Sequence, residues 1–179
     1  MKRVAVFGNA GGGKSTLARN LAAITRLPLY TLDIVQFPDG GNKPKISQGE
    51  YLKLHAELLN REAWIIDGFE SVARTWERFA KADTLIYVDL PLITHHWFVT
   101  KRLIKGLFAN PPGWPDNTPV WESSMDSYKV LWRCHFRLTP KYRQLVADLA
   151  ASKRVHHLKS LAEVRAFLDT VKREYADAS

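Results

Sequence analysis

Gly8-Asn9-Ala10-Gly11-Gly12-Gly13-Lys14-Ser15 fits the pattern G-x-x-x-x-G-K-[ST] of a phosphate-binding P-loop. A short apolar run, Arg3-Val4-Ala5-Val6-Phe7, precedes the motif and is typical of a β-strand. The residues that follow carry Leu17, Leu21 and Ile24, which is the spacing of one helix face. The sequence therefore predicts a strand, a glycine-rich turn and a helix in succession, which is the context that this motif requires.

The chemistry expected of this loop is the binding of a nucleoside triphosphate. Backbone N–H groups from Asn9 to Gly13 would surround a phosphate, and the N-terminus of the following helix adds partial positive charge. Lys14 is placed to reach the β- and γ-phosphates, and Ser15 to ligate Mg²⁺. A glycine-rich turn that binds nothing is the alternative, and the agreement of strand, loop, Lys-Ser pair and helix argues against it. The expected nucleotide-binding residues are Gly8, Asn9, Ala10, Gly11, Gly12, Gly13, Lys14, Ser15 and Thr16.

The composition indicates one globular domain over residues 1–179, with 46% hydrophobic residues and therefore a sizeable core. No apolar run is long enough to cross a membrane, and no membrane partner is expected. The single cysteine, Cys134, cannot form an internal disulfide, and Met1-Lys2-Arg3 does not look like the start of a signal peptide. We therefore expect a reduced, cytoplasmic setting.

The net charge of +8 leaves several kinds of partner open. Clustered Arg and Lys would bind an anionic small substrate such as a nucleotide, and the same residues would attract nucleic acid. A cationic surface that only keeps the protein soluble is a third interpretation, and composition alone does not separate the three.

Strands and helices alternate along the rest of the chain. The strands are apolar on both faces, which indicates a parallel sheet covered by helices on both sides. Residues 36–46 and 110–119 are rich in Pro and Gly and predict loops, the second of them a candidate lid. Thr139 is expected to cap a helix that has Pro140 at its first position. Further strands are expected at 27–33, 63–67, 84–89 and 153–158, and helices at 47–61, 72–80, 91–107, 121–138, 139–152 and from 160 onward.

Three carboxylates are expected near the ends of these strands, where ligands of parallel sheets bind. A P-loop enzyme needs an Asp near its Mg²⁺. We favour Asp67 for this role, because Gly68 after it lets the backbone pass close to bound phosphate. Asp89 precedes Leu90-Pro91, which is more typical of a helix cap. Asp33 would orient an acceptor hydroxyl or hold a metal-bound water, with a capping carboxylate as the alternative.

These residues together resemble the adenylate-kinase-like P-loop kinases. The similar stretches are Gly8–Ser15, Thr31–Asp33, Trp64–Phe69 and the basic helix that contains Lys101-Arg102. Among these kinases the pattern is most similar to the branch named DNA topology modulation proteins, which are expected to be nucleotide kinases. The resemblance implies an α/β P-loop NTPase fold with three α/β/α layers and a five-stranded parallel sheet of order 2-3-1-4-5. It also implies an acceptor-binding segment at 34–62 and a helical lid region at 102–135.

The resemblance further implies roles for individual residues. Asp67 would support Mg²⁺ through water, and Arg102 would lie beside the ATP base and phosphates. Arg133 and Arg137 would contact the transferring phosphate, where arginine stabilises the charge of the moving group. A solvated basic helix face is the alternative for each arginine. Glu70-Ser71 stand where adenylate kinases have Pro-Arg, which argues against AMP as the acceptor.

The sequence therefore predicts an ATP-dependent, Mg²⁺-dependent kinase that passes the γ-phosphoryl group to a small acceptor, with nucleotides among the candidates. Two alternatives stay open: a nucleotide-dependent protein that binds and regulates nucleic acid, and a plain ATPase. The adjacent pairs His95-His96 and His156-His157 are expected to be structural or surface residues. The expected catalytic residues are Lys14, Asp33, Arg102, Arg133 and Arg137, and the expected metal-binding residues are Ser15 and Asp67.

Overall fold

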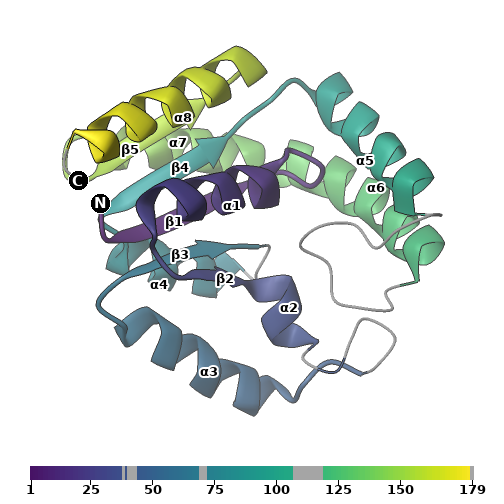
Figure 1. Cartoon of the computed structure of the whole chain (residues 1–179). Coiled ribbons are helices and arrows are strands. Elements are labelled where there is room, and N and C mark those ends of the chain that lie inside the picture. The colour runs from purple at the N-terminus through teal and green to yellow at the C-terminus, as the bar shows by residue number, and fades with distance from the viewer. Residues whose placement is uncertain (38, 40–43, 69–71, 107–118, 178–179) are drawn as a thin grey trace.

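Five parallel strands form the centre of the computed structural model, which describes residues 1–37, 39, 44–68, 72–106 and 119–177 (Figure 1). The sheet has the order β2-β3-β1-β4-β5 and is flanked by helices, which confirms the predicted α/β P-loop fold and its strand order. The strands are β1 (Arg3–Gly8), β2 (Leu29–Thr31), β3 (Trp64–Asp67), β4 (Thr84–Val88) and β5 (Arg154–Leu158).

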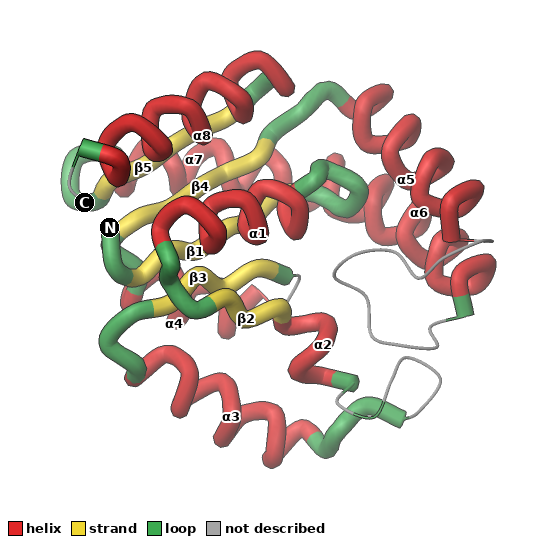
Figure 2. Tube along the Cα trace, viewed as in Figure 1, coloured by secondary structure: helices red, strands yellow, loops and turns green. Residues whose placement is uncertain are grey.

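The helices form layers on both sides of this sheet (Figure 2). Helices α1 and α8 cover one face and α4 and α7 the other, while α5 and α6 lie side by side at the end of the molecule (Figure 1). The helices are α1 (Lys14–Thr25), α2 (Leu32–Gln36), α3 (Gln48–Asn60), α4 (Val72–Lys81), α5 (Leu92–Gly106), α6 (Val120–Arg137), α7 (Thr139–Leu149) and α8 (Leu161–Ala176).

Alternate residues of β1 supply the two halves of the core. Val4 and Val6 pack toward α1 and α8, whereas Ala5 and Phe7 pack toward the helices on the other face. The ring of Phe7 stacks on Tyr87 at 5.0 Å between centroids. Each such fully buried side chain contributes about 1.5–3 kcal/mol to folding. Burial on both faces explains why the strands read as continuous apolar runs.

Two local predictions are wrong. The second strand was expected to end at Asp33, but β2 covers only Leu29–Thr31, and Asp33 lies in the first turn of α2. The reason is that β2 is an edge strand that pairs over three residues with β3, which leaves the chain free to turn into a helix. Thr139 was expected as an N-cap but is the first residue of α7, because the cap residue Leu138 keeps helical φ and ψ after α6.

The Pro-rich segment predicted as a loop at 110–119 lies outside the described residues, except for residue 119. Glu70 and Ser71 also lie outside them. In the part of the chain that the structure describes, none of the helices combines the length and the apolar character that a membrane span requires.

Candidate active site

The glycine-rich motif forms the turn from the end of β1 to the start of α1, as predicted. Gly8, Gly11 and Gly13 have φ angles of 143°, 67° and 75°, in the region that residues with side chains rarely adopt. At Gly8 there is also no space, because a Cβ atom would lie 2.2 Å from the carbonyl oxygen of Val88 on the neighbouring strand. The loop therefore has a backbone shape that depends on glycine at three positions.

Side chains of the loop are bonded to its own backbone. The Nζ atom of Lys14 donates a 2.8 Å hydrogen bond to the carbonyl oxygen of Asn9, so the ammonium group folds over the loop. The N–H of Ala10 donates to Oδ1 of Asn9 at 2.8 Å. One of the N–H groups expected to face a phosphate is thus engaged within the loop itself.

Four charged groups of the site lie within electrostatic reach of one another. Burial lowers the pKa of Lys14, against the opposing charges of Asp67 and Asp33. Burial, and then the charge of Asp67, raises the pKa of Asp33 to about 6. Burial also lowers the pKa of Arg102, which the charge of Asp33 opposes. The P-loop helix, α2, β3 and α5 therefore bring Lys14, Asp33, Asp67 and Arg102 to one edge of the sheet.

Asp67 is the last residue of β3 and is completely buried. Within the described ranges, neither of its carboxylate oxygens has a hydrogen-bond partner. A buried carboxylate without partners is unfavourable unless a cation or a donor meets it, so the residue fits a Mg²⁺ ion. At Gly68 the φ angle is 127°, and a Cβ atom would lie 2.9 Å from Cβ of Leu32, which explains the Asp-Gly pair.

The described residues contain no group of three or more His, Cys, Asp or Glu that could hold a metal ion. Mg²⁺ in nucleotide sites takes one or two carboxylates together with phosphate oxygens and water. Ser15, the other residue expected to ligate Mg²⁺, lies in the first turn of α1.

The three arginines expected at the site differ in their surroundings. Arg102 of α5 donates a 2.7 Å hydrogen bond from Nη2 to Oγ of Ser127 on α6, beside the charged cluster. Arg133 and Arg137 are exposed on α6. Arg133 lies two residues from the fully buried Leu131 and therefore about 200° around the helix from it. The structure brings Arg102 to the cluster, and Arg133 lies on the opposite side of α6 from the packed face.

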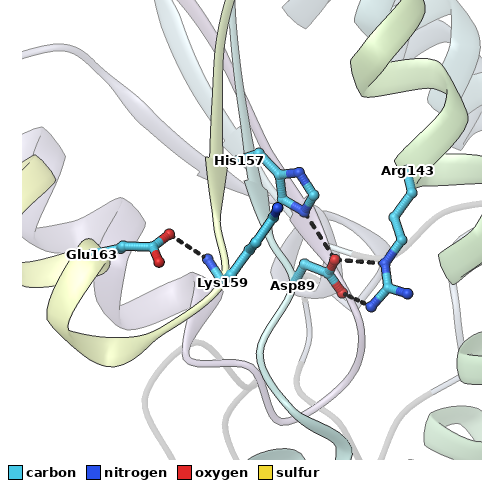
Figure 3. Close-up of polar contacts among 5 residues, drawn as sticks. All are labelled: Asp89, Arg143, His157, Lys159 and Glu163. Carbon is cyan, nitrogen blue, oxygen red and sulfur yellow. Dashed lines mark hydrogen bonds and ion pairs between the residues drawn. The ribbon is translucent and has the colours of Figure 1, made fainter.

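Asp89, which was expected to cap a helix, instead forms an ion pair and hydrogen bonds with two side chains. Its carboxylate lies between Arg143 and His157, as Figure 3 shows. It accepts hydrogen bonds from Nε of Arg143 at 2.7 Å, from Nη2 of Arg143 at 3.1 Å and from Nε2 of His157 at 2.8 Å. Burial acts to raise the pKa of Asp89, but these hydrogen bonds outweigh burial and lower it. Asp89 thus joins β4, α7 and β5 at this edge, while α5 begins only at Leu92.

Sequence reasoning missed two buried residues that contact the site. Nδ1 of His95 lies 2.7 Å from the carbonyl oxygen of Ala10 in the P-loop. Arg78 of α4 is 1% exposed, and its guanidinium makes long hydrogen bonds of 3.4 and 3.5 Å to the carbonyl oxygen of Gly68, directly after Asp67. The helical spacing of His95, Val99 and Arg102 was a signal that these residues share one face of α5.

A pocket of about 330 Å³ lies beside the first turn of α1. It adjoins the segment that carries Asp33 and the start of the predicted acceptor-binding segment 34–62. The lining residues are Ser15, Arg19, Leu29, Tyr30, Thr31, Ile34 and Val35.

Solved structures that share this fold include two shikimate kinases. Shikimate kinase from Acinetobacter baumannii in complex with shikimate has a TM-score of 0.55 and 13% sequence identity, with 100% of this chain and 95% of that chain covered. Shikimate kinase from Bacteroides thetaiotaomicron has a TM-score of 0.50 and 13% identity, with 98% of each chain covered. At these identities the likeness shows the fold alone. No protein-family model matches the chain, and the comparison with curated proteins found no match.

Proposed function

We propose that this chain is an ATP-dependent kinase that transfers the γ-phosphoryl group of Mg-ATP to a small-molecule acceptor. The observation that carries the proposal is the group of Lys14, Asp33, Asp67 and Arg102 beside the P-loop. Asp33 in particular supports transfer, because a carboxyl with a pKa of about 6 is suited to accept a proton near neutral pH. The fold shared with two shikimate kinases supports a small hydroxylated acceptor.

Each residue of the group has a defined task in this reaction. The acceptor oxygen bonds to the γ-phosphorus while the bond from that phosphorus to the β–γ bridging oxygen breaks, so ADP leaves. Asp33 takes the proton of the acceptor hydroxyl. Lys14 and Arg102 stabilise negative charge on the phosphates. Ser15 and Asp67 would hold Mg²⁺, which neutralises phosphate charge when bound.

The acceptor is proposed to bind along segment 34–62, which begins at the pocket beside Ser15 and Asp33. The region 102–135 would then cover the nucleotide on the side opposite to the acceptor segment, and Arg102 would be its arginine that faces the phosphates. We assign Arg133 and Arg137 no part in transfer, since both are exposed on α6. Membership in the adenylate-kinase-like group follows from the sequence resemblance and is part of this proposal.

The experiment that tests the proposal is a screen for acceptor-dependent ADP release. Nucleoside monophosphates, nucleosides, sugars and small hydroxy acids are each added with Mg-ATP, and Lys14→Ala serves as the control. We expect one acceptor class to stimulate ADP release by the wild type only. Equal ADP release without any acceptor would identify a plain ATPase, and wild-type transfer by Lys14→Ala would contradict the assignment.

Nucleic-acid binding is a second candidate, favoured by the exposed surface of α5 and α6. Aromatic rings interspersed with cations are what proteins use to stack bases and bind the phosphates of single strands. The test is binding of a single-stranded oligonucleotide at several salt concentrations. If the wild type binds it in a salt-dependent manner, Trp97→Ala does not, and no small molecule is phosphorylated, nucleic-acid binding replaces the kinase as the better assignment. The exposed aromatic residues are Trp97, Trp121, Trp132 and Phe136, and the exposed cations on the same helices include Lys101, Lys105, Lys129, Arg133 and Arg137.

A further inference from the structure

His95, on the buried face of α5, reaches the P-loop across 85 residues of sequence. The residue is 2% exposed, and its Nδ1 atom lies 2.7 Å from the carbonyl oxygen of Ala10. Because a carbonyl oxygen only accepts, Nδ1 carries the proton of this hydrogen bond. Burial lowers the pKa of His95 and so favours the neutral ring, against the opposing effect of hydrogen bonds to the backbone of Ala10 and Leu90.

This hydrogen bond fixes the orientation of a peptide group inside the phosphate-binding motif. The C=O of Ala10 and the N–H of Gly11 belong to one planar trans peptide and point in opposite directions. With the carbonyl held toward α5 on the outside of the loop, the N–H of Gly11 is turned away from α5. That direction is the one in which a P-loop presents its N–H groups to phosphate.

Helix α5 also packs directly against the glycines of the motif. A Cβ atom at Gly11 would lie 2.6 Å from Cγ2 of Val99 and 2.8 Å from the carbonyl oxygen of His95. A Cβ atom at Gly12 would lie 2.9 Å from Cε1 of the His95 ring. Because glycine has no side chain, α5 can pack directly against the loop at these positions, and the backbone stays accessible to phosphate.

The neighbouring helix α6 makes a second tether to the loop. Nδ2 of Asn9 donates a 3.1 Å hydrogen bond to the carbonyl oxygen of Leu131, and Oδ1 of Asn9 accepts from the N–H of Ala10 at 2.8 Å. The C=O of Ala10 is thus held by His95 of α5, and its N–H by the side chain of Asn9, which is itself hydrogen-bonded to Leu131 of α6.

We propose that His95 is a positioning residue for nucleotide binding: with Asn9, it holds the Ala10 peptide groups so that the P-loop keeps its phosphate-binding shape. His95 acts through the loop backbone and does not itself touch the nucleotide. The inference rests on the proposed function, because it assumes that this loop binds a nucleotide.

The test compares variants that differ in the donor at one position. Asn places its amide nitrogen at the same bonded position as Nδ1 of His, whereas Leu has the same branching without a donor, and Gln carries the amide one bond further out. His96 provides the matched control, since it is the next residue and stacks on Tyr128 of α6 at 5.7 Å. The dissociation constant of Mg-ADP is measured by calorimetry for His95→Asn, His95→Leu and His95→Gln, and for His96→Asn and His96→Leu.

We expect His95→Leu and His95→Gln to weaken Mg-ADP binding about tenfold, as the loss of one buried hydrogen bond implies, with His95→Asn within about threefold of the wild type. Both His96 variants should bind like the wild type. Equal affinities for Asn, Gln and Leu at position 95, or an equal loss in the His96 variants, would overturn the inference. His95→Gln keeps the comparison with Asn available if the Leu variant fails to fold, and circular dichroism checks the fold of each variant. If the wild type does not bind Mg-ADP, the proposed function fails instead.

Discussion

Asp33 and Asp67 lie close enough that the charge of Asp67 adds to the larger effect of burial and raises the pKa of Asp33 to about 6. Two carboxylates therefore share one edge of the sheet, and Lys14, Lys45 and Arg102 are the positive charges that act on Asp33. Such an arrangement favours catalysis of proton transfer near neutral pH, and it opposes the stability of the folded protein when both groups are ionised. The two effects can be separated by experiment.

Asp33→Asn is expected to stabilise the protein at about pH 7.5 by on the order of 1–3 kcal/mol and to abolish phosphoryl transfer. The pKa of Asp33 in the folded protein lies above the ordinary value of 3.8 for an Asp side chain, so wild-type stability is lost as pH rises from about 4 through about 6. The gain should therefore vanish below about pH 4, where the group is protonated in both states. Urea unfolding at the two pH values measures this difference. If Asp33→Asn raises the free energy of unfolding equally at about pH 7.5 and below pH 4, the charge of Asp33 is not the cause of the gain.

Asp67→Asn is expected to raise the Mg²⁺ concentration for half-maximal activity by about 10- to 100-fold, because it removes the buried carboxylate that fits the ion. Mg²⁺ titrations of ADP formation at fixed ATP measure this shift. Asp126→Asn is the matched control, since Asp126 is exposed and forms an ion pair with Lys129 at 2.9 Å. The Mg²⁺ assignment of Asp67 fails if both variants require the same Mg²⁺ concentration as the wild type.

The parts of this molecule that sequence could predict depend on interactions between near neighbours. The P-loop needs glycine within a few residues of Lys14, and the side chain of Ser160 caps α8 by accepting from the N–H of Glu163 at 3.1 Å. Apolar runs such as Trp64-Ile65-Ile66 predict buried strands because both faces of the sheet are covered. These signals are local, and they were sufficient for the strand order once the resemblance to P-loop kinases was added.

The features that sequence missed depend on how distant segments pack. His157 lies 68 residues from its partner Asp89, and no local pattern connects them. The sequence named Arg102, Arg133 and Arg137 together, but their exposure depends on how α5 and α6 pack: Arg102 is partly buried and bonds to Ser127, whereas Arg133 and Arg137 are exposed. Asp33 was misplaced on a strand because the length of β2 is set by its pairing with β3 and not by its own apolar residues.

Gly8→Ala is expected to destabilise the protein by about 2–4 kcal/mol, because a Cβ atom there would lie 2.2 Å from a backbone oxygen at a φ angle of 143°. Gly49→Ala is the matched control, since nothing lies within 4 Å of the added atom in the first turn of α3. The control should stabilise the protein by about 0.5–1 kcal/mol. Denaturant unfolding measures both changes, and a tolerated Gly8→Ala would contradict the loop geometry described above.

Arg143→Met is expected to destabilise the protein by about 1–2 kcal/mol at neutral pH, because it withdraws two hydrogen bonds from the carboxylate of Asp89, whose side chain is 7% exposed. Met retains much of the apolar stem of Arg, so the loss reports mainly on the charged group. The pKa of Asp89 is lowered in the folded protein, so the stabilisation by this ion pair is present above about pH 4 and declines as the pH falls further.

Lys129→Met is the matched control for this ion pair, because the side chains of Lys129 and Asp126 are 74% and 70% exposed. An exposed pair of this kind contributes at most about 1 kcal/mol to the free energy of unfolding. A double-mutant cycle of Arg143→Met with Asp89→Asn, followed by urea unfolding at neutral pH and near pH 3, isolates the interaction between the two side chains. We expect a coupling of about 1 kcal/mol or more at neutral pH and a smaller one near pH 3. A coupling that does not change with pH would mean that the buried charge of Asp89 is not what Arg143 stabilises.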